Sequence, residues 1–183
     1  MKKAISIGIQ GFSDLREQDC FFVDKTNFIK EWWGKRDVVT LITRPRRFGK
    51  TLNMSMLDCF FSNKYANRAD LFEGLSIWQD ETYRKLQGTY PVIFLSFAAV
   101  KAGNLEDAKT QIKQEITRLY WENRNLMKED IFGEDERELY YRTTVKMDDV
   151  TAQDSLRNLS VWMERYYGKK VIILLDEYDT PMQ

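Results

Sequence analysis

Two short segments of the sequence concentrate the side chains that could do chemistry. The first runs from Arg44 to Thr51 and ends in Gly-Lys-Thr. Where such a loop leads into a helix, backbone N–H groups and the helix dipole converge on a bound anion. Gly49 lets the backbone come close because it has no Cβ. Lys50 would reach the β- and γ-phosphates of a nucleoside triphosphate, and the Thr51 hydroxyl would ligate Mg²⁺.

This loop departs from the general GxxxxGK[ST] pattern at its first position, where the chain has Arg44 instead of glycine. A non-glycine residue resists positive φ, so the start of the loop would be tighter. Arg44, Arg46 and Arg47 either offset that cost by charge-assisted phosphate contacts or are simply solvated. Gly-Lys-Thr also arises by chance, but the apolar run before it and the helical pattern after it favour a phosphate loop over an accidental strand-turn-helix.

The second segment is an apolar run, Val171–Leu175, followed directly by Asp176 and Glu177. An Asp at the carboxyl end of a parallel strand lies beside the phosphate loop. Asp176 would hold Mg²⁺, and Glu177 would polarise an attacking water, as in a Walker B motif. The alternative is two solvated turn carboxylates, but the phosphate loop about 125 residues upstream, in the right order, favours the motif. For Asp179 we favour a structural role.

Strands and helices must position these side chains, and the sequence predicts both. Short apolar runs typical of buried parallel strands occur at Val38–Thr43, Val92–Phe97 and Lys170–Leu175. Helical spacing predicts helices at Lys25–Trp33, Lys50–Phe61, Leu105–Trp121 and Asp154–Tyr167. Asn104 is the expected N-cap of the third helix, and Thr151 with Asp154 resembles a capping box before the fourth. This alternation indicates an α/β sheet, with a helical insertion or lid-like excursion around residues 122–150.

Composition bounds the class of protein. The 183 residues fit one domain and are 43% hydrophobic, which argues against disorder. Lys plus Arg equals Asp plus Glu at 28 each, so there is no global attraction to nucleic acid or to an anionic membrane. The absence of histidine excludes Ser-His-Asp and Cys-His catalysis. Neither a signal peptide nor a long apolar run is found, so we expect a soluble, cytoplasmic protein without a membrane span.

With both motifs in view, the chain resembles the bacterial AAA-ATPase-like domain family, which is similar to archaeal and STAND-type ATPases. The resemblance covers nearly the whole chain. The residues that carry it are Gly8-Ile9, Phe12, Leu15–Glu17, Phe22–Thr26, Thr43–Leu52 and Leu175–Pro181. An arginine at the position of Arg44 looks like the family's own version of the loop, so the missing glycine counts less against a phosphate loop here.

The resemblance implies ATP and Mg²⁺ as ligands and a P-loop three-layer sandwich with a mainly parallel sheet. The residues expected to bind the nucleotide are Arg44, Pro45, Arg46, Arg47, Phe48, Gly49, Lys50, Thr51 and Leu52. Thr51 and Asp176 are expected to hold the metal, and Lys50 and Glu177 are the expected catalytic residues. Phe22–Thr26 is expected to lie near the adenine; alternatively, Phe21, Phe22 and Val23 are ordinary core residues before a helix that begins at Thr26.

Many family members carry a C-terminal nuclease-like domain of the PD-(D/E)XK superfamily, and none is found here. The chain ends at Gln183, seven residues beyond Asp176. We therefore expect residues 1–183 to be the N-terminal part of the ATPase domain, with the sheet incomplete after the Walker B strand.

Mg-ATP binding, with hydrolysis in the intact protein, is the leading hypothesis. A non-enzymatic nucleotide switch that controls a C-terminal domain is the alternative. We expect contact with nucleic acid only through such a domain, and the sequence does not determine an oligomeric state.

Overall fold

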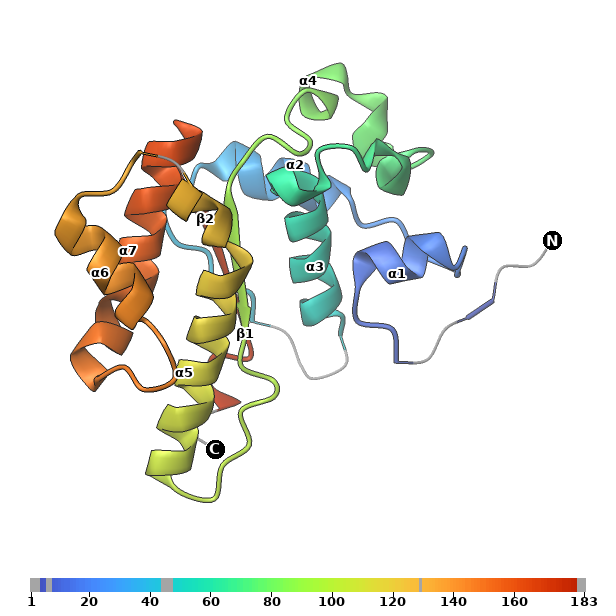
Figure 1. Ribbon diagram of the computed structural model, residues 1–183. Helices are drawn as coiled ribbons and strands as arrows, with labels where there is room; N and C mark the ends of the chain where they lie inside the picture. Colours follow the sequence, from blue (N-terminus) through green and yellow to red (C-terminus); the bar gives the residue numbers. More distant parts are fainter. Residues whose placement is uncertain (1–3, 6–7, 44–47, 129, 181–183) are drawn as a thin grey trace. The chain divides into compact units, whose positions relative to one another are not determined.

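The computed structural model describes residues 4–5, 8–43, 48–128 and 130–180 (Figure 1). The chain divides into two compact units, Met1–Tyr90 and Pro91–Gln183. The phosphate-loop sequence belongs to the first unit and the carboxylate pair belongs to the second.

The first unit is built from helices. Its α-helices and 3-10 helices are α1 (Phe12–Glu17), α2 (Asn27–Lys35), α3 (Lys50–Phe61), η1 (Asn63–Tyr65), η2 (Ala69–Phe72), η3 (Ser76–Gln79) and α4 (Glu81–Arg84). Helix α3 has the bounds that the sequence predicts. It ends at Ser62, whose hydroxyl accepts a hydrogen bond from Lys64 N at 3.3 Å and so begins η1.

Aromatic side chains form the centre of the first unit. Phe12, Phe60 and Phe72 are fully buried. The Phe12 and Phe72 rings stack with centroids 5.1 Å apart, and Phe60 meets Phe72 edge-on, also at 5.1 Å. Burying a phenylalanine contributes roughly 1.5–3 kcal/mol, and each such ring pair adds about 0.5–1.5 kcal/mol. These rings hold α1 and η2 against α3.

The second unit contains a parallel pair of strands and the helices between them. Its elements are β1 (Val92–Ser96), α5 (Leu105–Glu122), η4 (Arg124–Lys128), α6 (Glu134–Arg142), α7 (Asp149–Tyr167) and β2 (Ile172–Asp176). The register runs from Val92 opposite Ile172 to Ser96 opposite Asp176. Parallel neighbours need a crossover connection, and α5 to α7 supply it. The α/β class is therefore confirmed.

Helices α5 and α7 pack on each other, and α5 covers β1 (Figure 1). Asn104 caps α5 as predicted, because its side-chain oxygen accepts from Asp107 N at 2.8 Å. The capping box predicted at Thr151 and Asp154 is wrong. Asp148 caps α7 instead, accepting from Thr151 N at 2.7 Å, and the helix begins at Asp149. The Asp148 carboxylate precedes the first helical residue and accepts from the N–H of the third, as the side chain of an N-cap does.

The segment around residues 122–150 is helical, as predicted, but it is no excursion from the unit. Leu126, Phe132, Tyr140 and Met147 are all buried in the hydrophobic core of the second unit. They belong to the same core cluster as Trp162 of α7, so the segment packs as part of the unit and is not a lid. The weak helical periodicity of the segment hid these residues, because each lies in a different short element or connection.

The strand predicted at Val38–Thr43 is wrong for this structure. In the described part of the chain these residues join no ladder, and Val38 and Val39 are 100% and 84% exposed. A strand requires a neighbour for its N–H and C=O groups, and β-branched composition does not supply one. The described residues thus contain a two-stranded parallel sheet, and the full three-layer sandwich is not formed among them.

Candidate functional site

The described part of the predicted phosphate loop begins at Phe48, since residues 44–47 (Arg44, Pro45, Arg46 and Arg47) lie outside the described residues. Phe48 is 62% exposed. Gly49 has φ 75° and ψ 26°, the left-handed conformation, and is the N-cap of α3. A side chain at this position would be strained, although a Cβ there would meet no atom of the described residues within 4 Å. The backbone conformation therefore favours glycine at this position.

Helix α3 begins with Lys50, Thr51 and Leu52, all partly buried. Gly49 provides no side-chain cap, and the first turn contains no acidic residue. The first N–H groups of a helix have no partner within the helix, and together with the dipole they favour an anion. The geometry of residues 49–52 fits a phosphate group.

Asp176 is the last residue of β2 and is 4% exposed. Its backbone oxygen accepts a hydrogen bond from Phe97 N at 3.0 Å. Among the described residues, its Oδ2 is buried without any hydrogen-bond partner. A buried carboxylate oxygen without a donor costs several kcal/mol unless a cation compensates it. Because Mg²⁺ is bound through one or two carboxylates together with waters and phosphates, Asp176 fits such an ion.

Glu177 follows directly in an unusual backbone conformation. Its φ is 50°, in the left-handed region that non-glycine residues rarely adopt. Thr180 N donates to Glu177 O at 3.0 Å and closes the turn. The Glu177 residue is half-buried, beside the buried carboxylate. Strain of this kind costs about 1–3 kcal/mol and clusters at functional sites.

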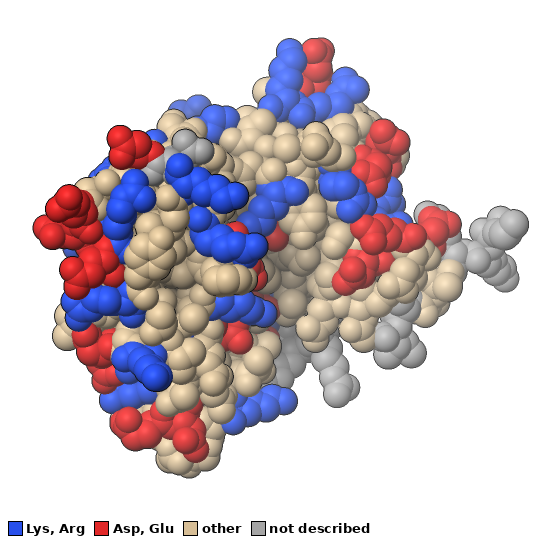
Figure 2. Space-filling view, viewed as in Figure 1, with Lys and Arg blue, Asp and Glu red and all other residues tan. Residues whose placement is uncertain are grey.

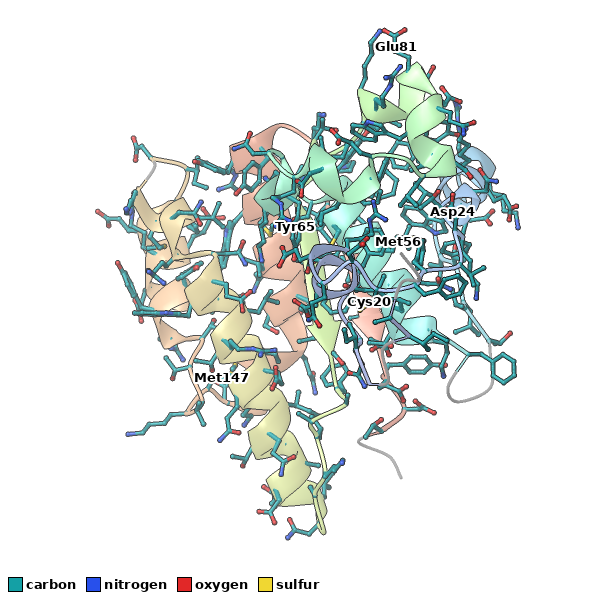
Figure 3. All side chains as sticks on the ribbon, turned by 90° about the vertical axis from the view of Figure 1, so that its right-hand side faces the viewer. Cys20, Asp24, Met56, Tyr65, Glu81 and Met147 are labelled. Atoms are coloured by element: carbon teal, nitrogen blue, oxygen red, sulfur yellow. The ribbon has the colours of Figure 1, made fainter. Side chains whose placement is uncertain are left out.

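The Phe22–Thr26 segment is explained by an interaction that sequence reasoning missed. Asp24, labelled in Figure 3, accepts hydrogen bonds at both carboxylate oxygens. Its Oδ1 accepts from Thr26 N and Oγ1 at 2.9 and 2.7 Å, and its Oδ2 accepts from Ser76 N and Oγ at 2.7 and 2.6 Å. Thr26 Oγ1 in turn accepts from Ile77 N at 3.1 Å. We call these four residues, Asp24, Thr26, Ser76 and Ile77, the Asp24 clamp. The spacing Asp-x-Thr, typical of an Asx turn, was the available signal.

The clamp charge is strongly stabilised. Burial acts to raise the pKa of Asp24, but the hydrogen bonds from Ser76 and Thr26 outweigh it and hold the pKa at about 2. The predicted core role of Phe21 and Val23 is wrong, since they are 55% and 59% exposed, whereas Phe22 meets Phe12 edge-on at 5.5 Å. The exposed side chains of Phe21 and Val23 thus lie close in sequence to Asp24, whose two carboxylate oxygens both accept hydrogen bonds from within the chain.

A second carboxylate that accepts several hydrogen bonds, that of Glu136, lies in the other unit. Arg165 donates to both oxygens of Glu136 at 2.8 and 3.1 Å, and Trp162 Nε1 donates to Oε1 at 3.1 Å. The Arg165 guanidinium, helped by Gly133 N, lowers the pKa of Glu136 to about 2. These hydrogen bonds join α6 to α7, so the role of Glu136 is structural.

Charge is mixed over the second unit. Figure 2 shows Lys and Arg side chains interspersed with Asp and Glu side chains over α5 to α7. Ion pairs such as Lys113 with Asp149, at 2.7 Å, account for part of this pattern. On the face shown, the second unit therefore presents a surface of mixed charge.

Comparison with known proteins places the chain in a family. The model of the family described as "Predicted AAA-ATPase" matches residues 6–183. The chain belongs to the AAA-ATPase-like family. The match extends over both units, and so over the phosphate-loop sequence and the strand that ends in Asp176.

One curated relative of this AAA-ATPase-like chain is the "Uncharacterized protein in vnfD 5'region" of Azotobacter chroococcum mcd 1. It is 26% identical over 182 residues, which cover 99% of this chain and 30% of the relative. The chain thus spans about a third of that protein's length. No solved structure matches the chain. In the residues that the structure describes, no helix is long and apolar enough to cross a membrane.

Proposed function

We propose that this AAA-ATPase-like chain binds Mg-ATP, and that the whole protein hydrolyses it. The observation that carries the proposal is the buried Asp176 carboxylate, whose Oδ2 has no partner among the described residues. Left-handed Gly49 at the uncapped start of α3 supports the phosphate half of the site. Membership of the family supports the use of a nucleotide and a metal.

Each residue has a separate role in the proposal. The backbone N–H groups at the start of α3 and the Lys50 ammonium bind the β- and γ-phosphates. The Thr51 hydroxyl and Asp176 would hold Mg²⁺, which supplies charge compensation for the phosphates. Glu177 orients the attacking water and accepts its proton, since phosphoryl transfer depends on positioning and electrostatics.

Isothermal titration with Mg-ATP tests whether the chain binds this nucleotide through the phosphate loop. We expect Lys50→Ala to weaken the affinity at least about tenfold, or about 1.4 kcal/mol. Lys85→Ala is the matched control, because Lys85 is an exposed lysine that follows α4 and forms an ion pair with Glu81. Equal affinities for wild type and Lys50→Ala would remove the phosphate loop from the proposal.

The hydrolysis half is tested separately in the whole protein. We expect Glu177→Gln to bind Mg-ATP like wild type and to lose turnover. Asp154→Asn, an exposed carboxylate of α7, is the control. Normal phosphate release by the Glu177→Gln variant would exclude Glu177 as the residue that orients water.

A nucleotide switch without efficient turnover is the second candidate. The observation in its favour is the left-handed backbone of Glu177, next to Asp176, because such strain can be released when a site changes state. Nucleotide-dependent protection of the Glu177–Thr180 turn from proteolysis, with little phosphate release, would support it. Rapid turnover would favour the enzyme.

A further inference from the structure

The strand register places one more polar side chain beside Asp176. Ser96 is the last residue of β1 and is the partner of Asp176, the last residue of β2. Hydrogen bonds fix this register at both ends of the pair. Ile172 N donates to Pro91 O at 3.0 Å, and Phe97 N donates to Asp176 O at 3.0 Å.

Side chains alternate between the two faces of a strand, so residues directly opposite each other in a parallel pair project from the same face. Ser96 and Asp176 therefore share a face of the β1–β2 sheet, as do Phe94 and Leu174 two pairs earlier. Ser96 is partly exposed, whereas Asp176 is buried. Two paired residues of the sheet thus carry a hydroxyl and a carboxylate on one face, and Ser96 is the more exposed of the two.

The Ser96 hydroxyl has hydrogen-bonding capacity left over. A hydroxyl can donate one proton and accept two. Ser96 Oγ accepts one long bond, from Ala98 N at 3.4 Å, which leaves one acceptor lone pair, and its proton has no acceptor among the described residues. A water molecule bound to a cation donates hydrogen bonds, so this lone pair is the group that would bind it. The hydroxyls of Ser155 and Ser160 in α7, by contrast, donate to helix carbonyls at 2.6 and 2.7 Å.

We propose that Ser96 is a positioning residue for the cation at Asp176, and that its hydroxyl binds a water molecule of the Mg²⁺ hydration shell. Mg²⁺ dehydrates reluctantly and keeps several waters, which need partners in the protein. Groups that orient such ligands typically change metal affinity 10–100-fold when removed. This inference rests on the proposed function, because it needs a cation at Asp176.

The test measures the Mg²⁺ concentration that half-maximally strengthens ATP binding, by calorimetry on the 183-residue chain. Ser96→Ala should raise that concentration about tenfold and leave ATP affinity in EDTA unchanged. Ser96→Thr keeps the hydroxyl and should restore the wild-type value. Ser160→Ala removes the same atoms from α7 and should behave like wild type. A Ser96→Ala variant with the wild-type Mg²⁺ requirement overturns the inference.

Mn²⁺ alone, without nucleotide, provides a second readout. Its paramagnetism should broaden the amide resonances of Asp176 and Glu177 in wild type, and Ser96→Cys, which keeps the size of the side chain, should need about tenfold more Mn²⁺. Equal broadening in both proteins, or none in wild type, overturns the inference. Absence of ATP binding in EDTA and in Mg²⁺ would instead refute the proposed function, and the Mn²⁺ result would still decide the role of Ser96.

Discussion

Replacing Asp24 by asparagine removes the charge on which the Asp24 clamp depends. The wild-type carboxylate accepts two hydrogen bonds from Thr26 and two from Ser76. An asparagine has a single carbonyl oxygen, so one of these two sets of donors would face an NH₂ group. Because Thr26 is buried and Ser76 begins η3, the loss loosens the junction between the segment before α2 and η3.

The size of the effect follows from the pKa. A carboxyl whose pKa falls from 3.8 to about 2 on folding contributes up to about 2.5 kcal/mol when ionised. Asp24 is exposed over more than a third of its surface, so solvent screening reduces the expected loss to about 1 kcal/mol. The folded-state pKa is the lower one, so this stabilisation is complete above about pH 4 and is lost as the pH falls toward 2.

Urea unfolding, followed by tryptophan fluorescence to which Trp78 of η3 contributes, measures the free energy difference between wild type and Asp24→Asn. We expect about 1 kcal/mol at pH 7 and convergence of the two proteins near pH 2. Amide exchange at Ser76 and Ile77 should accelerate in the variant. Asp37→Asn, an exposed aspartate of the same unit, is the control. A difference that persists at pH 2, or unchanged exchange at these amides, would refute the electrostatic argument.

Three further predictions concern single sites. Gly88→Ala should lower the free energy of unfolding, measured in urea, by more than about 2 kcal/mol, because φ is 68° and a Cβ would collide with backbone. Gly74→Ala, at φ 79° with open space, should lower it by only about 1 kcal/mol. Glu136→Gln should lower stability by about 1 kcal/mol at pH 7, with the difference vanishing as the pH falls from about 4.5 to 2, because Arg165 lowers the pKa of Glu136. Glu177→Gly should raise the thermal midpoint by relieving φ 50° while turnover of the whole protein is lost; a lower midpoint would contradict the strain.

The sequence predicts those elements whose position depends on residues close to one another in the chain. The bounds of α3 were predicted because Gly49 precedes a continuous helical pattern, and the cap at Asn104 was predicted because capping involves a residue three positions away. The strands β1 and β2 were predicted because short apolar runs bounded by polar residues are typical of buried parallel strands.

The remaining elements depend on contacts between residues that lie far apart in the sequence. The 3-10 helices between residues 63 and 79 lack a 3.6-residue period, and their places depend on distant partners. Asp24 binds Ser76 across 52 residues, and Arg16 Nε donates to Leu71 O across 55 residues, at 2.7 Å. Asp176 Oδ2 likewise lacks a hydrogen-bond partner among the described residues because of its burial, which no spacing in the sequence reveals. Residues 38–43 show the converse, since strand-like composition cannot create a neighbouring strand.

The backbone bonds that end the β1–β2 pair have a consequence for how this sequence can vary. Main-chain atoms, which almost every residue shares, set the depth at which Asp176 sits. Mutational drift within Ile172–Leu175 can therefore exchange one aliphatic residue for another without moving the carboxylate. A single-residue deletion in that stretch would instead turn Asp176 to the opposite face of the sheet. Substitutions there should be tolerated far more readily than changes of length.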